Sequence, residues 1–331
     1  MTLFPRHDNP GIIVLAAYKP DPDLFARQLR SIQAQTVASY RCLVTSDGAP
    51  GATEALMRSA IGDDPRFEIL GFDERLGFYL NFERGLAAVP RDAPWVALSD
   101  QDDYWYPQKI ETLLPHLTQF AAVAGQARVI QHPSGKVVMH TTGRRNVEVA
   151  DFMLDNQYTG GQMLFRASVL EVALPFPRLH TPAQVHDHWI AVCAAFVGGS
   201  CVVDSVIQDY VQHGGNVIGE STPGFSPRRS IANARRIAQR YEGRSDLRGL
   251  SRAIYRVGIG WRETMVEALS ARVSTHSPDL DALRRLYGRD RKTARTALFL
   301  FRSARRGAVS VRSLAEYLAG AALSPIYRPR R

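Results

Sequence analysis

The sequence has no apolar run near the roughly 20 residues that a membrane-spanning helix needs, and it contains little cysteine. Its three cysteines, Cys42, Cys193 and Cys201, are odd in number, lie in apolar contexts and show no ligand-type spacing. This pattern argues against a disulfide framework and against a zinc site. The N-terminal segment also lacks a signal-peptide pattern, because its apolar stretch is only about seven residues long. We therefore expect reduced thiols and a cytoplasmic protein.

The charge is unevenly distributed over the 331 residues, which carry a net charge of +9. From Phe225 onward there are 24 Lys+Arg against 8 Asp+Glu, whereas the first 224 residues have 17 against 24. A basic tail of this kind suits nucleic acid, an anionic membrane or a solvated helical surface. The tail has no recognisable nucleic-acid module and no interleaving of aromatic and basic residues, so we expect no nucleic-acid partner.

Strand and helix patterns alternate through the first half of the chain. Apolar strand patterns are seen at 11–18, 40–47, 66–72 and 94–100, and helical spacing is seen at 21–35, 51–62, 76–89 and 107–120. Such alternation predicts an α/β fold with a largely parallel sheet. From about Phe225 the pattern changes to Arg-rich amphipathic helices. The loop at 219–227 is the best boundary, which predicts domains at 1–222 and 223–331.

Acidic residues follow several of the predicted strands. Asp47 and Asp73 each follow a strand, and the segment LSDQDDYWYP places Asp100, Asp102 and Asp103 after the fourth. In parallel sheets, ligands bind at the carboxyl ends of the strands. A D-x-D supplies hard oxygen ligands but too few of them to cage a metal, which favours Mg²⁺ or Mn²⁺ completing its shell from waters and substrate phosphates.

The segment ALSDQDDYWYPQKIE closely resembles the D-x-D region of family 2 glycosyltransferases with the GT-A fold, in particular the bacterial rhamnosyltransferase-like group. Further similar segments occur in family order and span about residues 11–219: VLAAYKPD, CLVTSDGA, RLGFYLNFERGLA, TGGQMLFRASVLEVALPFP, HDHW and YVQHGGNVIG. The resemblance implies a GT-A-type, mostly parallel nucleotide-binding sheet flanked by helices, followed here by a helical C-terminal region.

The resemblance also implies roles for individual residues. Ala17, Tyr18 and Asp47 would border the nucleotide base, and Asp100 would face the ribose and diphosphate. Asp102 would be the principal metal ligand, with His213 near the metal or diphosphate and Asp103 supporting it or binding the donor sugar. Gly160 and Gly161 would let the backbone approach the donor sugar or acceptor. Asp187 would be the general base, and partial burial there would raise its pKa toward a useful value.

The implied activity is a metal-dependent inverting transfer of a hexose, with rhamnose as the subgroup's sugar, from a nucleotide-diphosphate donor. The acceptor would be a hydroxyl of a glycan or lipid-linked glycan in cell-surface polysaccharide or lipopolysaccharide synthesis. The sequence departs from the family at Lys19-Pro20 after the first strand, at Ser46 where a second Asp is common, and at His188 where Trp is usual. These departures bear on the choice of donor and acceptor.

Other readings remain open at the level of sequence. The chain would fit an inactive, glycosyltransferase-like binding or scaffold protein held at the membrane by its tail, although Asp102 and Asp187 are both retained. A sugar-1-phosphate nucleotidyltransferase would need a glycine-rich N-terminal loop, which VLAAYKPD does not offer. The basic helices, best seen at 296–331, either lie on the cytoplasmic face of an anionic membrane or pack on the catalytic domain.

Overall fold

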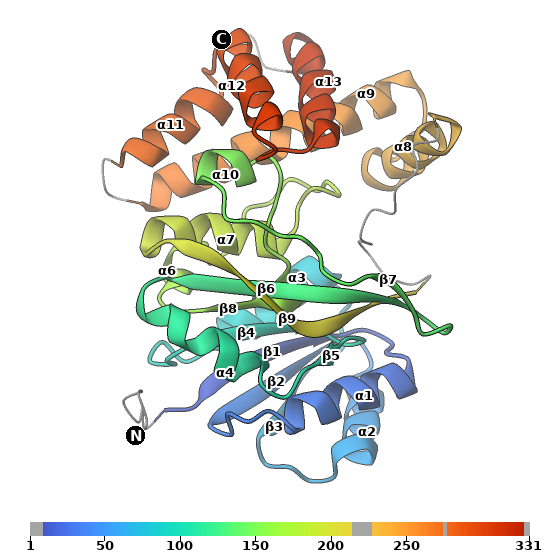
Figure 1. Cartoon of the computed structure of the whole chain (residues 1–331). Coiled ribbons are helices and arrows are strands. Elements are labelled where there is room, and N and C mark those ends of the chain that lie inside the picture. The colour runs from blue at the N-terminus through green and yellow to red at the C-terminus, as the bar shows by residue number, and fades with distance from the viewer. Residues whose placement is uncertain (1–8, 214–226, 274–276, 328–331) are drawn as a thin grey trace. The chain divides into compact units, whose positions relative to one another are not determined.

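The computed structural model describes residues 9–213, 227–273 and 277–327, with the backbone alone for 227–233. The chain divides into two compact units (Figure 1). Unit 1 comprises Met1–Asn146, Tyr158–Pro175 and His186–Glu220, and unit 2 comprises Val147–Gln157, Phe176–Val185 and Ser221–Arg331. Two short segments that precede residue 186 therefore belong with the C-terminal helices. The predicted domain boundary at 222–223 lies outside the described residues and stays a prediction.

Unit 1 follows the predicted alternation of strands and helices. Its strands are β1 (Gly11–Ala17), β2 (Tyr40–Asp47), β3 (Phe67–Phe72), β4 (Val96–Asp100), β5 (Tyr104–Trp105), β6 (Ala122–Gln131), β7 (Lys136–Met139), β8 (Met163–Phe165) and β9 (Ser200–Gln212). Its helices are α1 (Pro22–Gln33), α2 (Pro50–Ile61), α3 (Phe78–Ala87), α4 (Lys109–Leu113), α6 (Val169–Ala173) and α7 (His186–Val197), with 3₁₀ turns at η1 (Leu114–Thr118) and η2 (Gly160–Gln162).

The strands form one sheet in the order β3-β2-β1-β4-β8-β6-β9-β5, with β7 paired to β6. Strands β3, β2, β1 and β4 run parallel, as do β6 and β9, whereas β8 is antiparallel to both of its neighbours. The predicted α/β fold with a mostly parallel sheet is confirmed. Because β1, β2 and β4 are parallel and adjacent, their carboxyl ends meet at one edge of the sheet, where Asp47 and Asp100 are the last strand residues.

Both faces of β1 are buried, which explains its continuous apolar sequence. Its residues Ile13 and Leu15 join the core cluster that contains Phe25 of α1. On helix α3, Gly85 packs so closely on the sheet that a Cβ there would lie 2.5 Å from Val14 Cγ1 and 2.6 Å from a Thr45 methyl. A glycine at this position therefore sets how closely α3 approaches β1 and β2.

Helix boundaries in unit 1 follow capping chemistry. The Asp21 carboxylate accepts hydrogen bonds from the backbone N–H groups of Asp23 and Leu24, both at 3.1 Å, as predicted for an N-cap. The helix predicted over 107–120 is instead short, because α4 ends at Leu113 and continues as the 3₁₀ turn η1. Pro115 lies in that turn, where its missing N–H removes an α-helical hydrogen bond.

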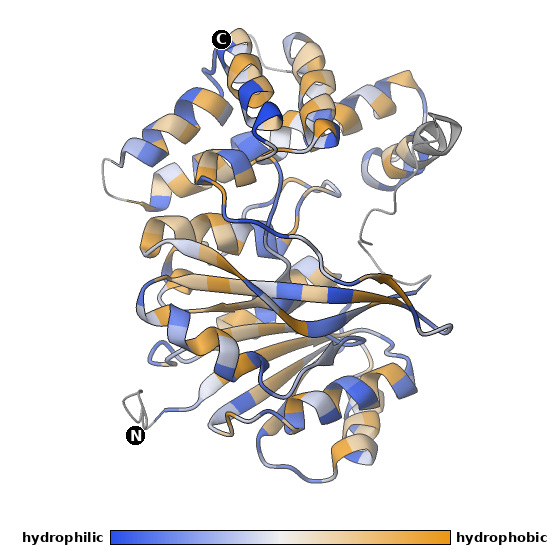
Figure 2. Cartoon of the chain, in the orientation of Figure 1, coloured by the Kyte–Doolittle hydropathy of each residue, from blue (hydrophilic) through white to orange (hydrophobic). Residues whose placement is uncertain are grey.

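Unit 2 is helical, as predicted for the C-terminal region. It contains α5 (Val149–Phe152), α8 (Pro227–Glu242), α9 (Leu247–Tyr255), the π-helical turn η3 (Arg256–Gly260), α10 (Trp261–Arg272), α11 (Pro278–Tyr287), α12 (Thr293–Arg305) and α13 (Val311–Tyr327). In Figure 2 the helices α11 to α13 carry hydrophobic and hydrophilic residues along their length, as amphipathic helices do. No helix in the described ranges is both long and apolar enough to cross a membrane.

Polar side chains inside unit 2 tie the early segments to the later helices. The Tyr287 hydroxyl donates to the carbonyl of Ala150 at 2.6 Å, and Arg262 Nη2 donates to the carbonyl of Leu154 at 2.7 Å. A buried ion pair joins Arg291 to Glu263. These contacts explain why the segment 147–157 belongs to the helical unit.

Candidate active site

The acidic loop between β4 and β5 folds back on the end of β9. Asp103 is almost fully buried, and its carboxylate accepts hydrogen bonds from the Gln208 side-chain amide at 3.0 Å and from the Val211 backbone N–H at 3.1 Å. Asp102 is half-buried, and its Oδ2 lies 2.7 Å from Nε2 of His213. The structure thus brings together Asp102 and His213, the two residues predicted to lie at a metal.

The carboxylates in this loop repel one another. Burial first, and then the negative charges of Asp102 and Asp187, raise the pKa of Asp100 to about 7. Burial, with the charges of Asp102 and Asp100 next, raises the pKa of Asp103 well above its usual value. Asp100, Asp102 and Asp187 therefore lie close enough to interact electrostatically, although Asp187 is 85 or more residues away in sequence. A cation bound here would relieve this repulsion.

One buried cation already lies beside the acidic loop. Lys109, at the start of α4, is 1% exposed, and its Nζ donates to the Gln208 side-chain oxygen at 2.6 Å and to the carbonyl of Gly161. The same ammonium lies 3.5 Å from the centre of the Trp105 ring. Burial lowers the pKa of Lys109 well below its usual value, and the carboxylates of Asp103 and Asp100 oppose this effect. Sequence reasoning did not assign Lys109 a role.

The two predicted glycines are packed between the carboxylates and α7. A Cβ at Gly161 would lie 3.2 Å from Asp103 Oδ2 and 3.5 Å from Asp100 Oδ2. A Cβ at Gly160 would lie 2.7 Å from Nε2 of His186. Glycine is therefore needed for the backbone of this turn to reach the acidic loop, which is a close approach within the protein itself. The predicted contact with donor sugar or acceptor stays a prediction.

Asp187 lies in the first turn of α7 and is half-buried. Its Oδ2 accepts a hydrogen bond from the Gly160 N–H at 3.1 Å, and its Oδ1 accepts one from the His188 N–H at 2.6 Å. Both oxygens are thus held by backbone donors, which fixes the orientation of the carboxylate. The glycine turn and the predicted base are joined directly.

His186, the neighbour of Asp187 in sequence, is 6% exposed. Neither of its ring nitrogens forms a hydrogen bond with the residues that the structure describes. Its ring stacks on Phe82 of α3 with centroids 3.9 Å apart. Burial lowers the pKa of His186 to about 3, so the ring is neutral at physiological pH. Its burial is set by Phe82 and Gly160, which are distant in sequence.

The loop after β1 is joined to the acidic loop by Gln101. Its side-chain oxygen accepts from the Tyr18 N–H at 2.7 Å, and its amide donates to the Tyr18 carbonyl at 3.3 Å. The guanidinium of Arg75 lies 4.0 Å from the centre of the Tyr18 ring. Ala17 is buried at the end of β1. Gln101 and Arg75 were not among the predicted residues, since a position in a loop alone carries no signal of such contacts.

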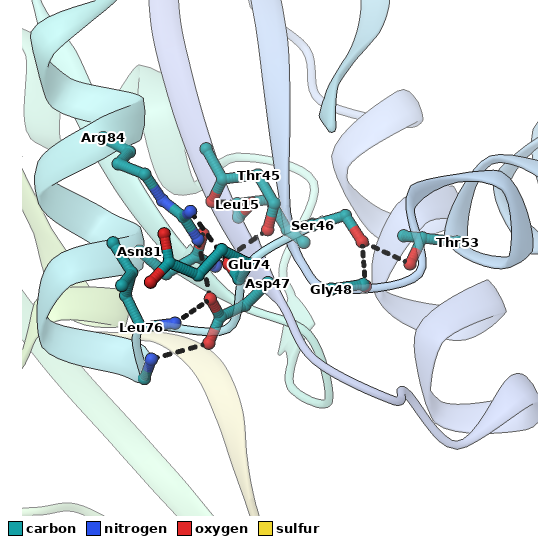
Figure 3. A network of polar contacts seen from close by, with 11 residues as sticks. Leu15, Thr45, Ser46, Asp47, Gly48, Thr53, Glu74, Leu76, Asn81 and Arg84 are labelled. Carbon is teal, nitrogen blue, oxygen red and sulfur yellow. Dashed lines mark hydrogen bonds and ion pairs between the residues drawn. The ribbon is translucent and has the colours of Figure 1, made fainter. Parts of the chain in front are cut away.

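Asp47 is the centre of a polar network at the end of β2 (Figure 3). Its Oδ1 accepts from the Leu76 N–H at 2.8 Å and from Arg84 at 2.6 Å, and its Oδ2 accepts from the Gly77 N–H at 2.8 Å. Asn81 extends the network by donating to the carbonyl of Thr45 at 2.8 Å. Asp47 therefore anchors the loop that leads into α3, and its predicted role at the base stays a prediction. Asp73, by contrast, is exposed.

The residues at the acidic loop fit a divalent cation that is held in part by substrate. In the described part of the chain, no group of three or more His, Cys, Asp or Glu is arranged to hold a metal ion by itself. Asp102 and His213 offer two adjacent donors, and the repulsion at Asp100 favours a positive charge nearby. This arrangement suits Mg²⁺ or Mn²⁺, which take remaining ligands from waters and phosphates.

The mostly parallel sheet with an acidic loop at its carboxyl edge has the arrangement of a GT-A-type fold. Residues 12–172 match the family model for glycosyl transferase family 2. The chain is 28% identical over 111 residues to the succinoglycan biosynthesis protein ExoW of Rhizobium meliloti (strain 1021). The aligned residues make up 33% of this chain. The match spans only 34% of that relative's length.

Two solved structures are similar over most of the chain. One is residues 1–349 of S. aureus TarS in complex with UDP-GlcNAc, with a TM-score of 0.52 and 14% identity, covering 96% of this chain and 93% of that one. The other is the mannosyltransferase PcManGT from Pyrobaculum calidifontis in complex with GDP-Man and Mn²⁺, with a TM-score of 0.48 and 16% identity, covering 97% and 88%. The likeness to TarS shows a shared fold.

Proposed function

We propose that this chain transfers a sugar, with inversion, from a nucleotide-diphosphate donor to a hydroxyl of a glycan or lipid-linked glycan. The observation that carries the proposal is the convergence of Asp100, Asp102 and Asp187 on one electrostatic cluster. Inverting transfer needs a base on the acceptor side and charge stabilisation on the leaving-group side. The family 2 match and the donor bound by TarS support a nucleotide sugar as substrate.

Asp187 is the proposed general base. Its carboxylate takes the proton of the acceptor hydroxyl while that oxygen bonds to the anomeric carbon. The bond from the anomeric carbon to the diphosphate oxygen breaks in the same step, and the nucleoside diphosphate leaves with the electron pair. The hydrogen bonds from the N–H groups of Gly160 and His188 hold the carboxylate in one orientation for this step.

The leaving-group side is proposed to lie at the acidic loop. Asp102 and His213 would hold Mg²⁺ or Mn²⁺, which would supply positive charge to offset the diphosphate. Asp100 and Asp103 are proposed to face the ribose, diphosphate and donor sugar. Their positions are fixed by the backbone of the loop and by the bonds that Asp103 accepts from β9.

The nucleotide base is proposed to lie against Ala17, Tyr18 and Asp47 at the ends of β1 and β2. Strand β1 pairs with both β2 and β4, so these residues share one sheet edge with Asp100. Rhamnose is proposed as the sugar because the segment SDQDDYWYPQK resembles the rhamnosyltransferase-like group. The process is proposed to be cell-surface polysaccharide or lipopolysaccharide synthesis, which the name of the succinoglycan relative supports.

Unit 2 is proposed to contact the cytoplasmic face of an anionic inner membrane as a peripheral protein. Among the described residues, five of the seven large hydrophobic side chains that are exposed belong to unit 2: Leu247, Leu298, Phe301, Val311 and Ile326. Leu298 and Phe301 lie three residues apart on α12 and so share a face of that helix. Exposed apolar side chains on Arg-rich helices favour an anionic membrane surface.

Calorimetric titration with UDP, dTDP and GDP, each with and without Mn²⁺, tests the proposed donor site. We expect one nucleotide to bind only when Mn²⁺ is present. Asp102→Asn should abolish that metal-dependent binding, whereas the matched variant Asp73→Asn, at an exposed strand end, should retain it. Binding of no nucleotide by the folded protein would reject the transferase proposal and favour a scaffold role.

A further inference from the structure

Unit 2 contains a cavity lined by arginines that plays no part in the proposed transfer. It lies where the end of α8, the start of α9 and the end of α13 meet, and its volume is about 270 Å³. Its lining includes Arg244, Arg248 and Arg252, together with Glu242 and the ring of Tyr327. Arg248 and Arg252 are four residues apart on α9, which places them on the same side of that helix.

The positive charge of this cavity is only partly neutralised. Among the described residues that line the cavity, Glu242 carries the single carboxylate. Its Oε1 lies 3.0 Å from Nη1 of Arg256, whereas its Oε2 lies 3.9 Å from Nε of Arg252. The guanidinium of Arg248 forms no hydrogen bond or ion pair with the residues that the structure describes. Glu242 therefore forms its closer ion pair with Arg256, and the charges of Arg248 and Arg252 remain available to an anion.

The shape of the cavity depends on a glycine and a capping interaction. Asp246 caps α9 by accepting a hydrogen bond from the Gly249 N–H at 3.0 Å, and it also accepts one from Nε of Arg244 at 2.7 Å. A Cβ at Gly249 would lie 2.2 Å from the carbonyl oxygen of Arg244. Glycine therefore lets the loop close on the helix, so that Arg244 joins the cavity wall.

Apolar side chains flank the arginines. Leu247, which precedes Arg248, is 84% exposed, and the lining residue Ile326 is 68% exposed. The Arg252 guanidinium lies 5.8 Å from the centre of the Tyr327 ring, which shields one side of the charge. A site for a free anion needs no exposed leucine and isoleucine at its rim, whereas an amphiphile with a charged head and an apolar tail matches both features.

We propose that this cavity binds the phosphate headgroup of an anionic phospholipid, with Leu247 and Ile326 entering the acyl boundary beside it. Arg248 and Arg252 would donate to the phosphate oxygens, which match the planar guanidinium fork. The inference rests on the proposed membrane contact of unit 2 and specifies its site, but it does not depend on sugar transfer.

Vesicle co-sedimentation of the full-length protein tests the proposal, with phosphatidylglycerol–phosphatidylcholine vesicles and with pure phosphatidylcholine vesicles. We expect binding to the anionic vesicles only. The double variant Arg248→Gln/Arg252→Gln should weaken it by roughly 10- to 30-fold, since each cation near an anionic surface contributes about a factor of five. A control with the same charge change, Arg285→Gln/Lys292→Gln, alters exposed cations that do not line the cavity and should weaken binding several-fold less.

A third variant separates a lipid from a free anion. Leu247→Gln keeps every arginine and should weaken vesicle binding, while inorganic phosphate at millimolar concentration should compete only weakly with vesicles. Equal losses in the cavity variant and the control would overturn the cavity assignment and leave a general charge effect. No vesicle binding at all would reject the membrane contact itself, and binding of inorganic phosphate without vesicle binding would make this a soluble-anion site. Nucleotide titration of the same preparations reports separately on the donor site.

Discussion

The buried ring of His186 makes the stability of unit 1 sensitive to mild acid. Its two nitrogens have no hydrogen-bond partner in the described part of the chain, and burial lowers its pKa from 6.5 to about 3. Between these values the unfolded chain binds a proton that the folded chain does not. The protonation of His186 therefore does not reduce the unfolding free energy above pH 6.5, the pKa in the unfolded chain. As the pH falls below 6.5, the unfolding free energy decreases.

The size of the effect follows from the two pKa values. At pH 5 the unfolded histidine is almost fully protonated while the folded one is not, which costs about 2 kcal/mol of unfolding free energy relative to pH 7. Asp100 acts in the opposite sense, because its raised pKa makes the folded state bind the extra proton in this range. The change of unfolding free energy with pH in the wild-type protein therefore contains both effects. The contribution of His186 is obtained by subtracting the change measured for a variant that lacks this histidine.

Urea unfolding at pH 7 and pH 5 compares the parent protein with His186→Phe, which keeps a ring on Phe82 and removes the titration. Trp261 is the tryptophan of unit 2, so a Trp261→Phe background makes fluorescence report on unit 1, where Trp95, Trp105 and Trp189 are buried. We expect the variant to lose about 2 kcal/mol less on acidification, and the exposed-site control His140→Gln to behave as the parent. If the parent and His186→Phe lost the same unfolding free energy between pH 7 and pH 5, within about 0.5 kcal/mol, the reasoning would be refuted.

Three further predictions concern the proposed base, the core and the helical unit. Asp187→Asn should leave metal-dependent nucleotide binding intact and lower kcat by about 10²- to 10⁴-fold, and near wild-type turnover would exclude it as the base. Gly85→Ala should cost about 1–3 kcal/mol in urea unfolding, because its methyl would overlap Val14, and an unchanged midpoint would mean that α3 shifts freely. Arg291→Met should cost about 3–5 kcal/mol by removing the cation that pairs with buried Glu263, and adding Glu263→Leu should recover most of it. Equal stabilities of the single and double variants would contradict that account.

Local patterns were sufficient to predict most of the elements of unit 1. The apolar run of β1 and the cap at Asp21 are properties of a few adjacent residues, and both were confirmed. The break of the fourth helix at Pro115 was missed, because proline is common in a first turn and the 3₁₀ turn begins just before it. The assignment of 147–157 to unit 2 was also missed. No change in composition marks this segment, and its contacts, such as Ala150 with Tyr287, come from residues more than 100 positions later.

The candidate site residues that stand out in the sequence by themselves are those whose chemistry is local. Asp100, Asp102 and Asp103 stand out because three carboxylates follow one strand, whereas Asp187 was predicted through the family resemblance. Lys109 was not assigned a role, because a lysine in a helix near Pro107 is usually solvated. Its burial depends on Gly161 and Gln208, which join it from other parts of the fold.

The discontinuous makeup of unit 2 affects how the chain is made on the ribosome. Residues 147–157 are synthesised early, yet Tyr287 and Arg262, which bind their carbonyls, emerge more than 100 residues later. At about 5–20 residues per second the delay is on the order of ten seconds. During that time the apolar side chains of Phe152, Met153 and Leu154, all buried in the final structure, lack their later neighbours in unit 2 and are open to chaperones. Nascent chains stalled before residue 287 should therefore be held by chaperones more strongly than released protein.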